Sequence, residues 1–223
     1  MALFCRPTEM NKPTAWIKGL DLRYGKEAEL AQLRRHVEQS HDFSTHLPYK
    51  TDHVNKRIIK GMKKWLEPLT DKSPQKLNII PVGGICMCHS NAQEAVDYLG
   101  QLRIMGIPFT FRVAVGYNLM ACSCGSDYWG EVHSVIYCEE NGEYYDITED
   151  MYGEKMKWFV ECPNLTKNYK KRASTKNGGG NRSMDMIAST IDGCKKCSIY
   201  RRPEDRCYTY YGANLEAVAK TFS

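Results

Sequence analysis

Apolar positions recur with helical spacing in three segments of the first half of the chain. Residues 26–40 carry an apolar side chain every three or four positions, as an amphipathic helix does. A second stripe runs from residue 51 or 52, where Thr or Asp can cap a helix, to about residue 66. The third covers about 90–105 and ends at a Gly-Ile-Pro sequence. The first 20 residues lack such a period and predict an extended arm, and residues 74–84 predict a connector.

Further along, the apolar pattern changes to that of strands. Residues 109–117 are rich in β-branched and aromatic side chains and predict a buried strand, whereas the composition of 118–130 predicts a loop. Residues 131–138 and 143–148 predict a hairpin joined by Glu-Glu-Asn-Gly. N-terminal helices followed by one long helix and an antiparallel sheet indicate an α+β fold.

The predicted hairpin determines which side chains face one another. If its four-residue loop has no bulge, Cys138 pairs with Glu143, and Val135 lies opposite Asp146. Side chains alternate faces along a strand, so His133 points the same way as Val135. His133 and Asp146 would then be diagonal neighbours on one face of the hairpin. A bulge in the loop would put them on opposite faces, so the register is an assumption at this point.

Composition narrows the class of protein. The 223 residues are 42% hydrophobic and 26% charged, with a formal net charge of +5, which excludes a disordered chain. No apolar run reaches the roughly 18 to 20 residues of a membrane helix, and no basic segment followed by a long apolar run opens the chain. We therefore expect a cytoplasmic protein without a membrane partner. The ten cysteines of such a protein are reduced thiols that react, bind metal or pack.

Three residues, in chain order, form a pattern with a known chemistry. Cys88 stands near the start of the third predicted helix, His133 in a strand and Asp146 in the next strand. A helix N-terminus favours the thiolate, which is the reactive form of cysteine. A histidine can take the thiol proton and return it to a leaving group, and a carboxylate behind it fixes the histidine tautomer. The pattern predicts a thiol nucleophile with its base and an orienting carboxylate.

The order of these pieces resembles the transglutaminase-like superfamily over residues 83–150. The matching features are Cys88 with Ala92 four residues later, Gly106-Ile107-Pro108, Gly116-Tyr117, His133, and Asp146-Ile147-Thr148. The resemblance implies a papain-like core, with the nucleophile helix packed on an antiparallel sheet and Cys88, His133 and Asp146 as the triad. It also implies that an amide or peptide acyl group is cleaved or transferred through a thioester, on a protein or peptide substrate, with an amine as a second acceptor. Hydrolysis, as by a cysteine protease or amidase, is the favoured outcome, and no cofactor is required for catalysis.

Cys86 competes with Cys88 as the nucleophile. In the superfamily the cysteine usually lies about one helical turn closer to the Gly-Ile-Pro glycine than Cys88 does, and one added turn keeps the helix face nearly aligned. Counting from Cys86 adds about five residues and rotates that face away. However, Gly84-Ile85-Cys86 fits the Gly-x-Cys lead-in of the superfamily better. We favour Cys88 and keep Cys86 as the alternative.

Two other groups of residues are candidates for function. Asp127, Tyr128 and Trp129 precede the histidine strand and are expected either to line the substrate cleft or to form an ordinary loop anchored by an aromatic side chain. A CxC pair and a CxxC pair could together complete a tetrahedral thiolate site for structural Zn²⁺; they are Cys122, Cys124, Cys194 and Cys197. The alternative for these cysteines is a set of reduced thiols without metal.

The excess positive charge lies near the C-terminus. Residues 166–202 contain ten Lys or Arg and two Asp, a local net charge of +8. We therefore divide the chain into 1–165, the N-terminal helices with the catalytic core, and 166–223, a basic and cysteine-containing extension of the same domain. The basic segment is either a solvated loop or a contact surface for nucleic acid. The alternative function is accordingly an inert, zinc-stapled basic module that binds nucleic acid or an acidic partner.

Overall fold

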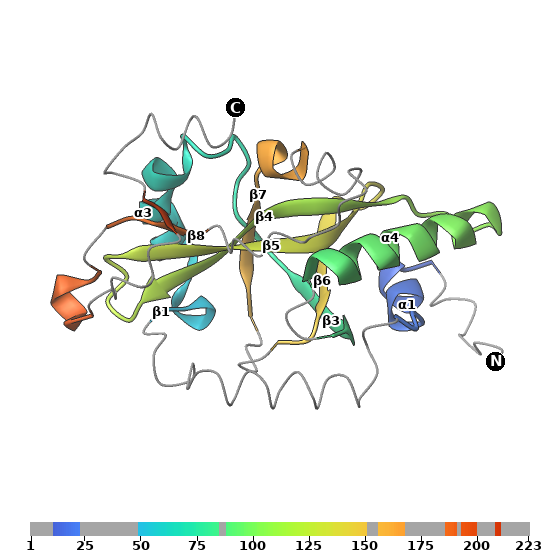
Figure 1. Ribbon diagram of the computed structural model, residues 1–223, viewed down its shortest axis with the longest axis horizontal. Coiled ribbons are helices and arrows are strands. Elements are labelled where there is room, and N and C mark those ends of the chain that lie inside the picture. Colours follow the sequence, from blue (N-terminus) through green and yellow to red (C-terminus); the bar gives the residue numbers. More distant parts are fainter. Residues whose placement is uncertain are drawn as a thin grey trace. The chain divides into compact units, whose positions relative to one another are not determined.

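The computed structural model describes residues 11–22, 49–84, 88–150, 156–167, 186–190, 193–199 and 208–210 (Figure 1). These residues belong to two compact units. The first unit draws them from Met1–Ser44, Leu77–Ala114 and Ser134–Glu154, and the second from Thr45–Lys76, Val115–His133 and Lys155–Ser223. Both units combine helices with paired strands, so the predicted α+β class is confirmed at this level. The predicted boundary between residues 165 and 166 stays a prediction.

Strands of the first unit lie in the order β4 (Phe111–Cys122), β5, β6, β3, and their pairing is mixed. β6 (Glu143–Thr148) is antiparallel to β5 (Tyr128–Cys138) and parallel to β3 (Asn78–Gly83). The sheet was predicted to be antiparallel, and the parallel β3–β6 pair corrects this. The segment predicted as a connector at 74–84 contains β3, because its apolar centre is long enough to pair along β6.

Helix α4 (Cys88–Ile104) packs on β6, and the short helix α1 (Pro13–Lys18) packs on β3 (Figure 1). α4 confirms the long helix predicted at 90–105 and begins two residues earlier. It buries Ala92, Ala95 and Leu99, which recur at the spacing of one helix face. α1 replaces part of the predicted extended arm. Pro13 suits the first helical position, and Ile17 is fully buried.

The strands of the second unit surround the continuous strand β4 (Phe111–Cys122). One edge of β4 pairs with β7 (Trp158–Glu161) and, nearer the end of β4, with β1 (Tyr49–Lys50), and β5 lies on the other side. β2 (Gln75–Lys76) extends the sheet beyond β7. β8 (Met186–Ala188) pairs with β5, and β9 (Tyr208–Tyr210) pairs with β8.

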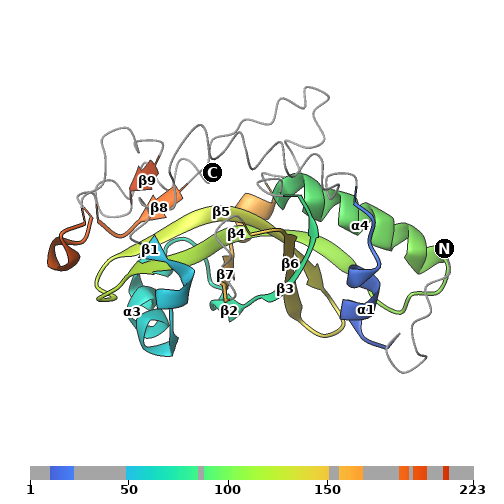
Figure 2. The same cartoon turned by 90° about the horizontal axis from the view of Figure 1, so that it is seen from below.

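Helix α3 (Lys56–Leu66) covers this part of the sheet (Figure 2). Its buried side, with Met62, Trp65 and Leu66, packs in one core with Tyr117 and Leu119 of β4. The helix predicted from residue 51 or 52 is wrong at its start. Residues 51–53 form the 3₁₀ helix η3 (Thr51–His53), and α3 begins only after Asn55, whose side chain caps it.

Strand β4 runs five residues beyond the predicted 109–117, and β5 begins at Tyr128. The loop predicted at 118–130 is therefore wrong except for the turn at 123–127. Buried side chains from Leu119 to Cys122, together with pairing to β7 and β1, keep this segment extended. The helix predicted at 26–40 lies outside the described residues. Within the described part of the chain, no helix combines the length and apolar character needed to cross a membrane.

Candidate functional site

Cys88 is the first residue of α4, and its side chain is half-buried. Within the described residues, the thiol therefore lies at the N-terminal end of the helix, the end at which backbone N–H groups lack intrahelical partners. The long helix is kept in place by its buried face, which packs on β6. The structure thus places the favoured nucleophile in the setting predicted for it. The alternative nucleophile, Cys86, lies outside the described residues.

Asp146 is fully buried on β6, the strand on which α4 packs. The predicted register of its hairpin is confirmed, since Cys138 pairs with Glu143 and Ile136 with Tyr145. Continuing this register places Val135 opposite Asp146. One carboxylate oxygen, Oδ1, accepts the backbone N–H of Thr148 at 3.1 Å. Cys88 and Asp146 therefore belong to one unit, on two elements that contact each other.

His133 lies in β5, and its side chain is 9% exposed. It is the last residue of its segment in the second unit, whereas Cys88 and Asp146 lie in the first. The grouping of the three residues as a catalytic triad stays a prediction.

Sequence reasoning missed two polar side chains in the first turns of α4. His89 hydrogen-bonds through Nδ1 to the Ser134 hydroxyl of β5. Asn91 is fully buried; its amide donates to the Gly84 carbonyl at 2.7 Å and to the Thr148 hydroxyl at 3.2 Å. The signal in the sequence is a polar residue within an apolar stripe, because Asn91 occupies the same helix face as Ala95. The first turns of α4 are therefore fixed by polar contacts as well as by apolar packing.

The three residues predicted to line a cleft have structural contacts in the second unit. Asp127 is 1% exposed, and its carboxylate accepts hydrogen bonds from the hydroxyl groups of Tyr49, Ser189 and Thr190. The ring of Trp129 is buried and stacks on that of Tyr49 at a centroid distance of 5.7 Å. The ring of Tyr128 lies against Trp65 of α3. A role for the three residues in a substrate cleft stays a prediction.

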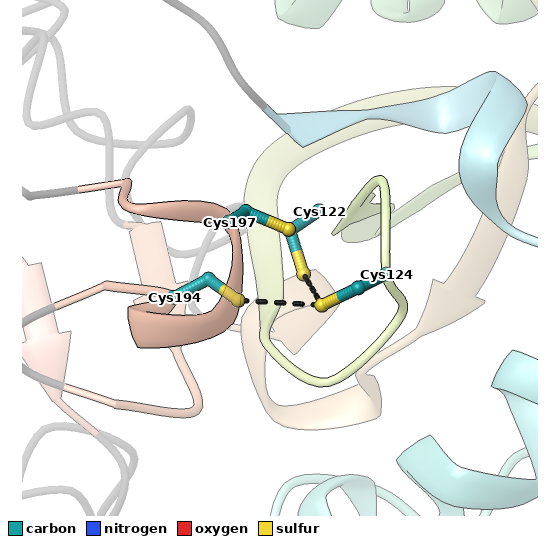
Figure 3. Close-up of side chains that lie close together, drawn as sticks. All are labelled: Cys122, Cys124, Cys194 and Cys197. Atoms are coloured by element: carbon teal, nitrogen blue, oxygen red, sulfur yellow. Dashed lines mark hydrogen bonds between the residues drawn. The ribbon is translucent and has the colours of Figure 1, made fainter.

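Four cysteines from two distant segments meet in the second unit (Figure 3). Cys122 ends β4 and Cys124 lies in the turn after it, while Cys194 precedes and Cys197 ends the 3₁₀ helix η4 (Lys195–Cys197). Their sulfur atoms all lie within 4.8 Å of one another, and Cys124 Sγ is 3.4 Å from both Cys122 Sγ and Cys194 Sγ. Tetrahedral Zn²⁺ with bonds of about 2.3 Å holds its sulfur ligands about 3.8 Å apart. These four cysteines could therefore hold a metal ion, and none of them forms a disulfide.

Hydrogen bonds lower the pKa of two cysteines of the cluster, Cys124 and Cys194. A hydrogen bond from Ser126 lowers the pKa of the Cys124 thiol to about 6. Burial alone would raise the pKa of Cys194, but hydrogen bonds from Ser126 and the backbone of Cys197 lower it. Burial raises the pKa of Cys122 to about 11, although the Asp127 N–H donates to its sulfur at 3.3 Å. Burial therefore favours the protonated form of Cys122, and a bound cation would displace that proton.

Each cysteine pair is followed by a residue with positive φ. Gly125 follows Cys124 with a φ of 65°, and Ser198 follows Cys197 with a φ of 52°. The positive φ favours glycine at position 125, and a side chain there would also approach Ile58 Cδ1 to 2.8 Å and require it to move. The two turns reverse the chain at the point where each pair presents its sulfur atoms, which allows both pairs to face one centre.

Comparison with known proteins adds no relative to this picture. No family model matches the chain, and neither the curated proteins nor the solved structures contain a match.

Proposed function

We propose that this protein is a transglutaminase-like thiol enzyme that cleaves or transfers an amide or peptide acyl group. One observation carries the proposal. Cys88 opens α4, and α4 packs on β6, the strand that holds the buried carboxylate of Asp146. A nucleophilic thiol needs a site that stabilises its anion, and a catalytic histidine needs a carboxylate that fixes its tautomer. Cys88 is the candidate for the thiol and Asp146 the candidate for the carboxylate, and both lie in the first unit.

In the proposed reaction, the Cys88 sulfur attacks the carbonyl carbon, and a C–S bond replaces the C–N bond of the amide. His133 takes the thiol proton and gives it to the leaving amine. Asp146 orients His133 and stabilises its cationic form. Water then attacks the thioester and restores the thiol, which makes hydrolysis the outcome; an amine in place of water gives transfer.

Thiol alkylation tests the nucleophile directly. Cys86 and Cys88 are the two cysteines of the tryptic peptide 77–103, so mass spectrometry can follow that peptide after brief exposure to iodoacetamide at neutral pH. We expect rapid addition of one label in the parent protein and in Cys86→Ala, and none in Cys88→Ala. Undiminished rapid labelling of Cys88→Ala would exclude Cys88. His133→Ala should slow the labelling of Cys88, because the base that takes the thiol proton is removed.

We also propose that the second unit holds a structural Zn²⁺ ion with Cys122, Cys124, Cys194 and Cys197 as ligands. The sulfur separations support a tetrahedral site, and four thiolates are a common ligand set for structural zinc. Lys195 and Lys196, both exposed in η4, offset part of the negative charge of the four thiolates. The ion would join the turn after β4 to the segment that follows β8.

Metal analysis of the purified full chain tests the zinc site. We expect about one zinc ion per chain in the parent protein and in Cys88→Ala, which lacks a thiol outside the cluster. Cys124→Ser and Cys197→Ser should lose most of the metal. Equal zinc content in all four proteins, or a metal-free parent with disulfide-linked cysteines, would exclude the site.

A basic module that binds nucleic acid is the second candidate function, and helix α3 favours it. All five basic residues of this helix are exposed, and the helix contains no acidic residue; they are Lys56, Arg57, Lys60, Lys63 and Lys64. A gel-shift titration at two salt concentrations distinguishes the candidates. Binding that weakens steeply with salt supports the module, and no shift at low salt excludes it.

A further inference from the structure

The end of β3 and the end of β6 form a close pair beneath the first turn of α4. Gly83 is the parallel partner of Thr148, and the N–H of Glu149 donates to the Gly83 carbonyl at 3.1 Å. A side chain on Gly83 would lie 2.5 Å from Asn91 Cγ. Asn91 therefore packs directly on the Gly83 backbone, and this contact requires a glycine.

The amide group of Asn91 connects both strand ends to α4. It donates to the Gly84 carbonyl, just after β3, and to the Thr148 hydroxyl, on β6. Asn91 and Thr148 are buried, so water does not compete for these hydrogen bonds. A buried carbonyl that loses its hydrogen-bond donor finds no water in its place, so these hydrogen bonds favour one arrangement of helix and strands.

The same hydrogen bonds link the two candidate functional residues of this unit. Cys88 precedes Asn91 by three residues, so both lie on one face of the first helical turn. Thr148 donates its backbone N–H to Asp146 Oδ1, and its side chain accepts from Asn91. A connected chain of hydrogen bonds therefore runs from the helix turn of Cys88 to the carboxylate of Asp146.

We infer that Asn91 is a positioning residue, which holds the turn carrying Cys88 against the strand end carrying Asp146. This inference rests on the proposed function. Asn91 acts through the places it gives to the thiol and the carboxylate, and it takes no part in bond making. Small displacements of a nucleophile slow its reaction strongly, by up to about 100-fold for 1 Å.

The test measures alkylation of Cys88 as a function of pH. Every variant also carries Cys86→Ser, so the tryptic peptide 77–103 contains one thiol. We expect Asn91→Ala to slow labelling at neutral pH at least about tenfold and to change the dependence of labelling on pH. Gln93 lies on the same helix, and its side chain is hydrogen-bonded to Asp97. Gln93→Ala is therefore the control, and its Cys88 should be labelled at the rate of the parent protein.

Thr148 supplies variants that keep Asn91 itself. Thr148→Val removes the hydroxyl that accepts from Asn91 and should slow labelling severalfold, whereas Thr148→Ser restores the acceptor and should label like the parent. Thermal unfolding identifies any variant that is not folded at the assay temperature, and the pH midpoint is compared only among folded variants.

The outcomes separate the inference from the proposed function. A parent protein with an activated Cys88, together with unchanged pH midpoints in Asn91→Ala and Thr148→Val, overturns the role of Asn91 alone. A parent in which Cys88 labels with the pH profile of an ordinary thiol overturns the proposed function and the role of Asn91 with it. If Asn91→Ala does not fold, unchanged labelling of Thr148→Val overturns the inference by itself.

Discussion

Gly142 closes the hairpin between β5 and β6 with a φ of 70°, and its neighbour Glu143 then pairs directly with Cys138. The turn is further fastened by Asn141, whose side chain accepts the Glu143 N–H at 3.1 Å. A left-handed residue in this place lets four residues connect the strands without a bulge. The register that puts Val135 opposite Asp146 therefore depends on this turn.

Replacement of Gly142 should expose the cost of that conformation. The space beside Gly142 is open, because a side chain there would meet only Tyr137 Oη at an ordinary 3.7 Å. We expect Gly142→Ala to lower the free energy of unfolding by about 1–2 kcal/mol and Gly142→Asn by less, since asparagine tolerates positive φ. Urea unfolding measures both changes.

Gly100 provides the matched control. It lies in α4, with nothing near the position that its side chain would take. Gly100→Ala should raise stability by about 0.5–1 kcal/mol, because alanine loses less backbone entropy in a helix. A loss of stability in Gly100→Ala, or none in Gly142→Ala, would contradict the backbone argument.

Local signals in the sequence were enough to predict several features of the candidate site. The Glu-Glu-Asn-Gly turn determines the hairpin register over a few residues, and the apolar period determines α4 with Cys88 at its start. The spacing within each cysteine pair indicated a metal site, although which pairs meet depends on the fold. The hairpin register and the helix are confirmed because the interactions that decide them lie within one turn or one helix.

Contacts between distant segments were not predictable in this way. The short apolar run at 74–84 predicts only a connector, because parallel pairing with β6, more than 60 residues away, leaves no local signal. The hydrogen bond from Asn91 to Thr148 joins residues that are 57 positions apart in the sequence, and the one from Tyr49 to Asp127 joins residues 78 positions apart. Polar residues such as these resemble ordinary loop or helix residues until the fold brings their partners together.

Asn55 determines where α3 begins. Its side chain accepts the N–H groups of Arg57 at 3.0 Å and Ile58 at 3.1 Å, two of the donors that a helix start leaves without intrahelical partners. Asn55→Ala should lower stability by about 1 kcal/mol, whereas Asn55→Ser should keep most of it. Urea unfolding of the two variants beside the parent measures this. Equal stability of Asn55→Ala and the parent would mean that solvent replaces the cap.

The buried Asp127 carboxylate should depend on the Tyr49 hydroxyl. Tyr49→Phe keeps the ring that stacks on Trp129 and removes one of the three hydroxyl donors of Asp127. A hydrogen bond to a buried charged group contributes about 1.5–3 kcal/mol, so we expect a loss of that order in the free energy of unfolding. Tyr98→Phe, on the exposed side of α4, is the control and should change stability by less than about 0.5 kcal/mol. Similar values for both variants would rule out the predicted contribution of this hydrogen bond.

Glu140 should make the stability of the first unit depend on pH in the acidic range. Slight burial alone would raise the pKa of this carboxyl group, but hydrogen bonds from the Thr110 backbone and hydroxyl outweigh it and lower the pKa. The Thr110 N–H lies 2.7 Å from Oε2, and the Thr110 hydroxyl lies 2.7 Å from Oε1. The charged form is therefore the one that these bonds stabilise.

The sign of the effect follows from the lowered pKa. A carboxyl group whose pKa is lower in the folded than in the unfolded protein contributes stability above its unfolded pKa, and this contribution is lost as the pH falls through the folded value. At pH 7, Glu140→Gln should therefore be less stable than the parent, and the difference should shrink on acidification. NMR titration of the Glu140 carboxyl carbon measures its pKa, and urea unfolding across the acidic range measures the stability. Glu67→Gln, at the exposed end of α3, is the control and should show no such convergence. A Glu140 carboxyl group that titrates at the ordinary glutamate value would contradict the role given to Thr110.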